Sequence, residues 1–214
     1  MPGRVVVVGA VNVDLVMRLP ALPSPGQANA LVSAGHVLAA LGELSLAAAD
    51  VLVLSFEVPA AALRAAAGAA AQAGCQLVVN PAPVRPRSLD LLAGAIATPN
   101  VHELATLAQE LTSTDLPGTG PEPGTVALAL ARQTGSVVVV TIGSGGALLA
   151  DPGCTDQGQG TLLHVAGHRV AVRDTTGAGD TFTGVLAASL ASGHDLVAAV
   201  GRAVAASSGI GGTS

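Results

Sequence analysis

Short runs of valine, leucine and isoleucine alternate along this chain with longer stretches that are rich in alanine. Because these apolar runs carry few polar residues, each predicts a strand that is buried on both faces of a sheet. Strands that alternate with helices favour an α/β fold, in which helices cover both sides of a mostly parallel sheet. The predicted strands span residues 4–9, 50–55, 75–80, 94–99 and 136–143, and the predicted helices span 59–74, 100–112, 124–135, 179–192 and 195–208.

The later part of the chain departs from this alternation. Residues 146–151 and 160–174 predict antiparallel strands or hairpins, because the two apolar runs follow each other without a helix between them. The Pro- and Gly-rich stretch 115–124 predicts a surface loop and not a domain linker. With 214 residues, the chain is expected to form a single domain over 1–214.

The composition argues against nucleic acid and membrane partners. Half of the residues are hydrophobic, yet there are only two Phe and no Trp or Tyr, so little is available to stack on bases. All nine basic residues are arginines, they form no cluster, and the net charge is −5. We therefore expect neither nucleic acid nor an anionic membrane as a partner.

The composition also excludes several kinds of site. A chain without lysine has no Lys-containing P-loop and no Schiff-base chemistry. Cys75 and Cys154 are too far apart to indicate a metal site or a disulfide framework. Glycine, asparagine and aspartate interrupt the first apolar run, which therefore does not have the pattern of a signal peptide. No apolar stretch is long enough to span a membrane, so a cytoplasmic protein is expected.

Polar residues gather where the predicted strands end. In a parallel α/β sheet, ligands bind at the carboxyl ends of the strands, so these residues predict a site at that edge. They are Asn12, Asp14, Glu57, Asn80, Asn100, Glu103, and the segments 141–146 and 174–180.

The stretch Gly177-Ala178-Gly179-Asp180 directly precedes an apolar helical run. Glycines allow a tight turn that aims several N–H groups at one point, and the helix dipole adds attraction for an anion. Asp180 in the first helical turn could then accept a proton from a hydroxyl held there. The alternative is that Asp180 is only the N-cap of a helix after a Gly-rich turn.

Two further stretches admit both a functional and a structural interpretation. Asn100 and Glu103 lie three residues apart at a helix start and could reach a hydrated Mg²⁺, or they could form a capping box. The segment Gly143-Ser144-Gly145-Gly146 after a strand suits close approach by phosphates, but a hairpin turn has the same composition.

Near the start of the chain, Asn12 and Asp14 lie on the same side of an extended stretch. They could bind vicinal hydroxyls, or they could be a turn-forming pair. Glu57 ends a buried strand, where it could bind a polyol or simply be solvated before the next helix.

Together, these stretches resemble, in order and in position, the ribokinase-like (PfkB) sugar kinases, and the ribokinases among them most closely. The resemblance covers Arg4 to about Gln27 and about Ala49 to Ala206. It implies a three-layer α/β/α ribokinase-like fold with a mostly parallel sheet. The segments that carry it are VVVVGAVNVDLVMRLPALPSPGQ, VLVLSFEVP, VVNPAPVRP, ATPNVHELATL, VVVVTIGSGGALL and DTTGAGDTFTGVL.

The resemblance implies ATP-dependent phosphorylation of a hydroxyl of ribose or a related sugar. Asp180 would be the catalytic base and also contact the sugar, and Gly177, Ala178 and Gly179 would form the anion hole. The implied sugar ligands are Asn12, Asp14 and Glu57. The implied nucleotide ligands are Asn100, Thr141, Gly143, Ser144, Gly146 and Gly179. Glu103 would hold Mg²⁺ through water, and Asp174 and Thr176 would help to bind K⁺.

The chain also departs from the family pattern. A Gly-Gly-x-Gly-x-Asn segment that wraps the sugar is expected after Gln27, but residues 28–48 lead almost directly into the Glu57 strand, and the end at Ser214 comes early. A missing internal segment and a reduced or missing lid are therefore expected. The alternative function is an inactive remnant that only binds nucleotide or self-associates. An apolar edge left by missing strands predicts a homodimer or non-specific self-association.

Overall fold

A seven-stranded sheet forms the centre of the molecule, and strands that are adjacent in sequence are also adjacent in space. The computed structural model describes residues 2–9, 33–111, 122–153, 160–167 and 177–209. The strands are β1 (Val5–Val8), β2 (Val51–Ser55), β3 (Gln76–Asn80), β4 (Ile96–Ala97), β5 (Val137–Thr141), β6 (Gly146–Asp151) and β7 (Thr161–Ala166). Strands β1 to β5 pair in parallel, and β6 and β7 continue the sheet antiparallel.

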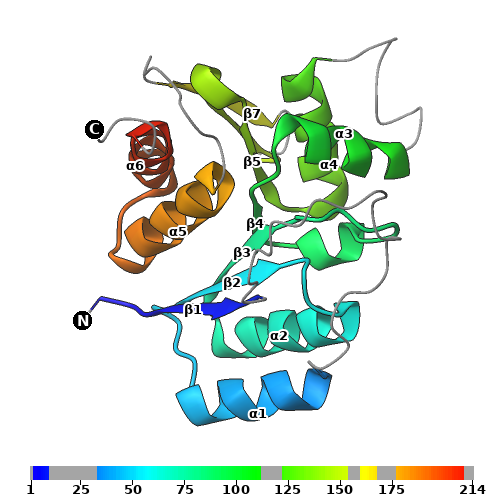
Figure 1. Ribbon diagram of the computed structural model, residues 1–214, viewed down its shortest axis with the longest axis vertical. Coiled ribbons are helices and arrows are strands. Elements are labelled where there is room, and N and C mark those ends of the chain that lie inside the picture. Colours follow the sequence, from blue (N-terminus) through cyan, green and yellow to red (C-terminus); the bar gives the residue numbers. More distant parts are fainter. Residues whose placement is uncertain (1, 10–32, 112–121, 154–159, 168–176, 210–214) are drawn as a thin grey trace, which may run out of the picture.

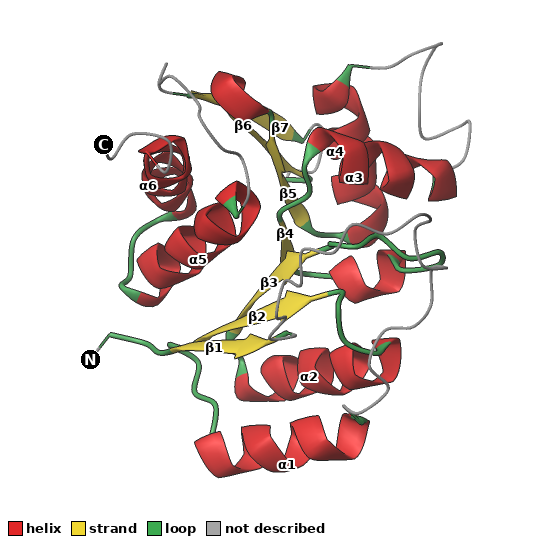
Figure 2. Cartoon of the chain, viewed as in Figure 1, coloured by secondary structure: helices red, strands yellow, loops and turns green. Residues whose placement is uncertain are grey.

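Helices cover both faces of this sheet, as Figures 1 and 2 show. One face carries α1 (Ala34–Leu44), α2 (Ala60–Ala73), α3 (Val101–Leu107) and α4 (Pro123–Thr134), and the other carries α5 (Ala178–Ala191) and α6 (Leu196–Gly209). Short 3₁₀ turns lie at Leu89–Leu92, Ala108–Glu110 and Gly143–Gly145. The predicted three-layer ribokinase-like α/β/α fold is confirmed, including the antiparallel strands after Ala147.

The two faces of β2 explain how one apolar run serves two helical layers. Leu52 and Leu54 belong to the core beneath α1 to α4, whereas Val51 and Val53 belong to the core beneath α5 and α6. Because successive side chains of a strand point to opposite faces, a strand buried on both sides must be apolar throughout. The pattern read from the sequence is therefore correct for β2.

The same prediction is wrong for β1. Val6 and Val8 pack against the core beneath α1 and α2, but Val5 and Val7, on the other face, are 38% and 64% exposed. Among the described residues β1 pairs only with β2, so it forms an edge of the sheet. The predicted apolar edge is present in the part of the chain that the structure describes. Strand β4 is also shorter than predicted, with two residues in place of the expected 94–99.

An ion pair between half-exposed Arg4 and buried Asp50 joins β1 to the start of β2. Asp50 is 3% exposed, and its carboxylate accepts from the backbone N–H of Arg4 at 2.8 Å and from its Nη2 at 2.5 Å. Arg4 also donates to the carbonyl of Leu44 at 2.8 Å and to that of Ser45 at 2.9 Å, at the end of α1. The hydrogen bonds from Arg4, and a further one from the N–H of Ala47, hold the pKa of the Asp50 carboxyl well below its usual range.

This lowered pKa predicts a particular dependence of stability on pH. The folded state holds Asp50 ionised below the pKa of about 3.9 that an unfolded aspartate has, so its contribution is complete above that pH and is lost as the pH falls further. Thermal unfolding from neutral to acid pH should show Asp50→Asn less stable than the wild type at neutral pH. The difference in melting temperature should shrink below about pH 4.

Asp90→Asn is the control for this experiment, because Asp90 pairs with Arg64 at 2.8 Å while both side chains are about half exposed. Exposed ion pairs contribute little to stability, so this variant should follow the wild type at every pH. Parallel curves for Asp50→Asn and the wild type down to strongly acid pH would contradict the assignment.

Candidate functional site

A cavity of about 200 Å³ opens at the carboxyl edge of the sheet, where the sequence predicts a site. It lies where β3, β4 and β5 end and where α3 and α5 begin. Its lining residues are Asn80, Ala82, Thr98, Asn100, Glu103, Thr141, Gly177, Gly179 and Asp180. The fold thus brings together two segments that are more than seventy residues apart in sequence, Asn100–Glu103 and Gly177–Asp180.

The first turn of α5 is open toward this cavity. Gly177 is the N-cap with a φ of +76°, a left-handed conformation that glycine adopts without strain, and no side chain caps the helix. The N–H of Thr181 donates to the carbonyl of Gly177 at 2.9 Å, which leaves the N–H groups of Ala178, Gly179 and Asp180 without intrahelical acceptors. These donors and the positive end of the helix dipole form an anion-binding arrangement.

Asp180 is the third residue of α5 and is exposed at the rim of the cavity. The alternative that Asp180 is the N-cap is wrong, because Gly177 occupies that position. Its carboxylate therefore serves no capping role in the described structure. An uncommitted carboxylate beside open backbone donors can accept a proton from a hydroxyl bound against them.

Asn100 and Glu103 form a capping box at the start of α3. The side-chain oxygen of Asn100 accepts from the N–H of Glu103 at 2.9 Å, and Oε2 of Glu103 accepts from the N–H of Asn100 at 2.8 Å. The structural alternative is therefore correct, and both residues also line the cavity. Among the described residues nothing donates to Oε1 of Glu103, so that oxygen can face a ligand while Oε2 holds the box.

Thr141 brings the end of β5 to the same cavity. Its N–H donates to the carbonyl of Pro99 at 3.0 Å, and an isolated parallel bridge joins it to Asn100. This bridge adds one further pairing to the sheet at Asn100, three residues beyond the end of β4. This bridge fixes Thr141 beside Asn100, as the prediction of a shared nucleotide site requires.

Gly143, Ser144 and Gly146 do not line the cavity in the described structure. They belong to the tight turn between β5 and β6, where the N–H of Ile142 donates to the carbonyl of Gly146 at 2.9 Å. Gly146 has a φ of +96°, and a Cβ there would lie 2.1 Å from the carbonyl oxygen of Val165. The hairpin turn considered from the sequence is thus present, and nucleotide contacts of these residues remain a prediction.

The remaining predicted ligands lie elsewhere. Glu57 follows β2 in the turn before α2, is half-buried, and does not line the cavity. The other four, Asn12, Asp14, Asp174 and Thr176, lie outside the described residues.

The cavity also includes residues that were not among the predicted ligands. Asn80 ends β3; it was predicted at this edge of the sheet, although no ligand was assigned to it. Thr98 gave no signal, because a threonine at the end of a two-residue strand has the pattern of any short connection.

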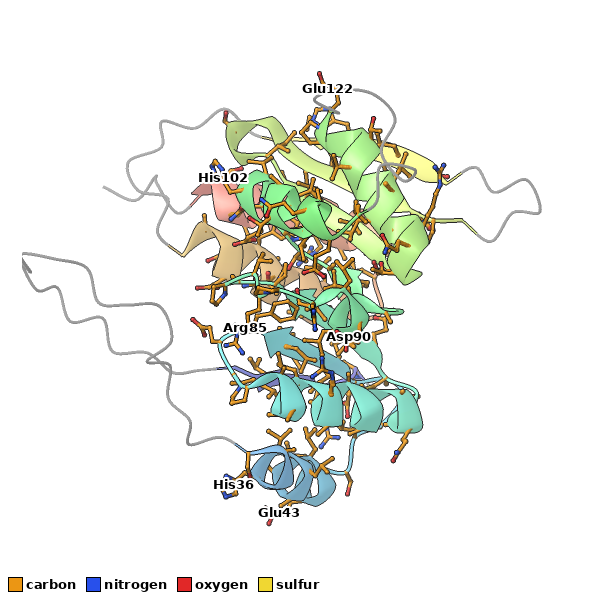
Figure 3. All side chains as sticks on the ribbon, turned by 90° about the vertical axis from the view of Figure 1, so that its right-hand side faces the viewer. His36, Glu43, Arg85, Asp90, His102 and Glu122 are labelled. Atoms are coloured by element: carbon orange, nitrogen blue, oxygen red, sulfur yellow. The ribbon has the colours of Figure 1, made fainter. Side chains whose placement is uncertain are left out.

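The charges at the cavity match a metal held mainly through water. No arginine lines it among the residues described, and Arg85 instead donates to the carbonyl of Val58 at 3.0 Å (Figure 3). Within those residues there is also no group of three side chains that could enclose a metal ion. Two carboxylates with neighbouring carbonyl and amide oxygens fit Mg²⁺, which keeps several waters and takes few protein ligands.

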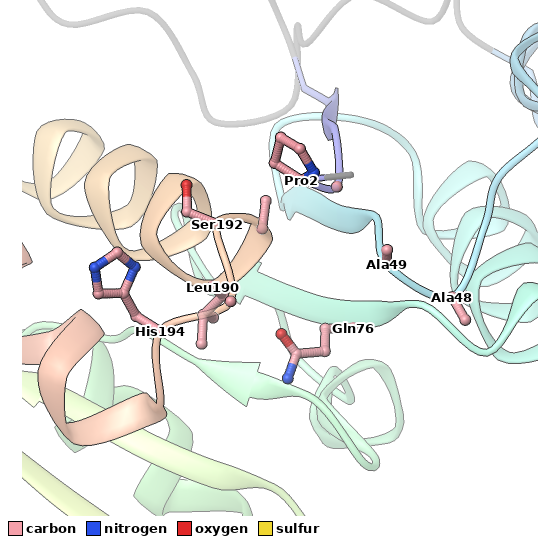
Figure 4. Close-up of a pocket in the computed structure, with 10 residues that line it drawn as sticks. Pro2, Ala48, Ala49, Gln76, Leu190, Ser192 and His194 are labelled. Atoms are coloured by element: carbon pink, nitrogen blue, oxygen red, sulfur yellow. The ribbon is translucent and has the colours of Figure 1, made fainter.

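A larger cavity of about 680 Å³ lies at the opposite, amino-terminal edge of the sheet (Figure 4). It is bordered by Pro2, Gln76, Ser192 and His194, and elsewhere mostly by alanine and glycine. It lacks a carboxylate and an open helix N-terminus among the described residues. Size alone therefore does not identify the site.

None of the helices in the described structure is both long and apolar enough to cross a membrane.

Comparison with known proteins agrees with this geometry. The family model for pfkB family carbohydrate kinases matches residues 21–210. A ribokinase of Schizosaccharomyces pombe is 32% identical over 156 residues, which are 72% of this chain and 46% of that protein. The bifunctional protein HldE of Azorhizobium caulinodans is 39% identical over 171 residues, 77% of this chain and 32% of that protein.

A solved ribokinase structure from Thermotoga maritima superposes with a TM-score of 0.57 at 26% identity, over 74% of this chain and 49% of that one. The chain thus spans about half the length, or less, of these relatives. The matched family region includes the whole of the described cavity, from Asn80 to Asp180. The chain belongs to the pfkB family of carbohydrate kinases.

Proposed function

We propose that this chain transfers the γ-phosphoryl group of ATP to a hydroxyl of ribose or a related sugar. The observation that supports this most strongly is the shared cavity of Asn100, Glu103 and the open first turn of α5 with Asp180. Phosphoryl transfer depends mainly on positioning and on neutralising charge, and this cavity offers groups for both tasks.

In this proposal Asp180 accepts the proton of the attacking sugar hydroxyl. The N–H groups of Ala178, Gly179 and Asp180 donate to the oxygens of the transferred group, where negative charge gathers. Since no arginine or lysine lines the described cavity, these backbone donors supply the fixed positive potential of the protein itself.

Glu103 is the proposed Mg²⁺ ligand, through water. Bound Mg²⁺ would neutralise the phosphates of ATP and hold them in a reactive geometry. The capping box keeps the Glu103 carboxylate in place, because Oε2 is already bonded to the backbone of Asn100 at 2.8 Å. Asn100 and Thr141, joined by a bridge, are the proposed contacts to the nucleotide phosphates.

The rest of the predicted machinery stays part of the proposal. Asn12, Asp14 and Glu57 are the proposed sugar ligands, and Asp174 and Thr176 are the proposed partners of K⁺. Gly143, Ser144 and Gly146 are further proposed ligands of the nucleotide. A cytoplasmic location and the reduced lid, with 28–48 bridging a missing segment, remain predictions.

A second candidate is a chain that binds nucleotide without transferring phosphate efficiently. One observation favours it: the cavity bounded by the described residues has a volume of about 200 Å³, below the ~300–1,000 Å³ typical of ligand pockets. A site that does not close leaves the phosphoryl group accessible to water.

Measuring ATP consumption with Mg²⁺ and K⁺ over ribose, other pentoses, hexoses and nucleosides separates the two candidates. Kinase activity requires turnover that depends on one sugar and falls by about 10²–10⁴-fold in Asp180→Asn, the loss expected for a general base. Asp180→Asn should bind MgATP about as well as the wild type, because the backbone donors remain.

Asp195→Asn is the matched control, since Asp195 also lies at a helix N-terminus but accepts from the N–H of Ala198, away from the cavity. It should retain wild-type turnover. Equal activity in the wild type and Asp180→Asn would contradict the role of Asp180. Binding of MgATP without any sugar-dependent turnover would favour the second candidate.

We also propose that the chain self-associates through the free edge of β1. Val5 and Val7 are exposed beside backbone groups that no other described strand pairs, and such an edge is a template for pairing with another strand. Light scattering during size-exclusion chromatography should give a mass above the 20.6 kDa of one chain. Val7→Lys should weaken the association by about tenfold or more, because a charge on an edge strand opposes pairing.

Val197→Lys is the control for this test, since Val197 is also half exposed but lies on α6 and not on the sheet edge. A monomeric wild type at tens of micromolar, or equal effects of both lysines, would contradict the proposed interface.

A further inference from the structure

Two buried hydroxyl groups meet between the end of β4 and the first turns of α5. Oγ1 of Thr98 and Oγ1 of Thr183 lie 3.1 Å apart, and each residue is only 5% exposed. Oγ1 of Thr98 also donates to the carbonyl of Val79 at 3.3 Å. Either hydroxyl can donate in the bond between the two threonines, and Thr183 is the donor when Thr98 donates to Val79.

This pair connects the two halves of the cavity. Thr98 is two residues before Asn100, and it lines the cavity itself. Thr183 is three residues after Asp180, so it lies about one helical turn further along the same side of α5. The contact therefore joins the Asn100–Glu103 segment to the Gly177–Asp180 segment through short, rigid connections.

The segment that holds Thr98 is itself fixed from two neighbouring strands. The N–H of Thr98 donates to the carbonyl of Val79 at 2.9 Å, and the carbonyl of Pro99 accepts from Thr141 at 3.0 Å. Strands β3 and β5 thus hold the segment 98–100 on either side. The hydroxyl of Thr183 adds the connection to α5.

Helix α5 packs on the sheet through buried apolar side chains, among them Phe182, Leu186 and Leu190. Helices α3 and α5 cover opposite faces of the sheet, so the contacts of one do not position the other. The first turn of α5 begins with two small residues, Ala178 and Gly179, before Asp180, and the cap at Gly177 has no side chain. The Thr98–Thr183 contact adds a directional hydrogen bond next to that turn, where the small residues offer little packing.

We propose that the Thr98–Thr183 hydroxyl pair is a positioning device, which holds the first turn of α5 at a fixed place relative to Asn100 and Glu103. Neither hydroxyl is a catalytic residue in this account; they act through Asp180 and the open amides. The inference rests on the proposed function for its consequence in phosphate binding, but the positioning itself is a property of the free protein.

The test replaces Thr183 by valine, which keeps the shape and removes the hydroxyl, and by serine, which keeps the hydroxyl. Hydrogen–deuterium exchange of the amides of residues 181–184 is measured without ligand, and the dissociation constant for MgATP is measured in parallel. We expect Thr183→Val to speed exchange in this turn and to weaken MgATP binding, each by about tenfold, which corresponds to one buried hydrogen bond. Thr183→Ser should restore most of both.

Thr134→Val is the matched control. Oγ1 of Thr134 meets Oγ of Ser136 at 2.5 Å and donates to the carbonyl of Leu130 at 2.7 Å, at the opposite edge of the sheet. If the Thr183 hydroxyl only stabilised the fold, Thr183→Val and Thr134→Val variants with the same loss of melting temperature would show the same exchange at residues 181–184 and the same MgATP binding. Positioning requires that only Thr183→Val change residues 181–184 and MgATP binding.

Exchange at 181–184 that is unchanged in a folded Thr183→Val, or changed equally by Thr134→Val or Thr183→Ser, would overturn the inference. If Thr183→Val does not fold, Thr183→Ala removes the hydroxyl without adding bulk and takes its place in the same comparison. A wild type that binds no MgATP would contradict the proposed function, and the exchange measurement would still decide the positioning role.

Discussion

The site depends on one constraint, which is that parallel strands end at the same edge of their sheet. Strands β3, β4 and β5 run in one direction, so Asn80, Thr98 and Thr141 all arrive at that edge. Helix α3 starts there on one face and α5 on the other. Groups from β3, β4, β5, α3 and α5 thereby surround one cavity, because all five elements begin or end at this edge of the sheet.

Hydrogen bonds then refine what the sheet positions. The bridge between Asn100 and Thr141 and the capping box of Asn100 with Glu103 hold one wall of the cavity. The other wall is the first turn of α5, whose donors are left open by the glycine cap. Asn100 and Glu103 thus cap α3 and are also proposed ligands. The capping hydrogen bonds fix the side-chain positions, and a fixed position favours binding in a reactive geometry.

Much of this architecture could be predicted from the sequence, because it follows from local patterns. Apolar runs indicate strands, alanine-rich runs indicate helices, and Gly-Ala-Gly-Asp indicates a turn before a helix. Each of these patterns lies within a short stretch of sequence. The exposure of Val7 depends on which strands lie beside β1, and a single apolar run cannot show that. The contact of Thr98 with Thr183 joins residues 85 positions apart and leaves no periodic signal.

The Gly-rich turn after β5 shows a different limit of prediction. Its glycines are explained by the close approach of Gly146 to the backbone of β7, where any side chain would collide. A phosphate loop and a tight hairpin need the same residue type for the same geometric reason. Composition therefore could not distinguish a phosphate loop from a hairpin turn at this segment. At Asp180 the two interpretations differ in the position of the residue, because an N-cap would precede the helix and Asp180 is the third residue of α5.

The central claim is that the two walls of this cavity form a working phosphate site in the chain as it stands. Isothermal titration of the intact, folded chain with ATP, in the presence and absence of Mg²⁺, tests it most directly. We expect one saturable site with a dissociation constant below about 1 mM that depends on Mg²⁺. A folded chain that gives no saturable heat with MgATP would contradict it.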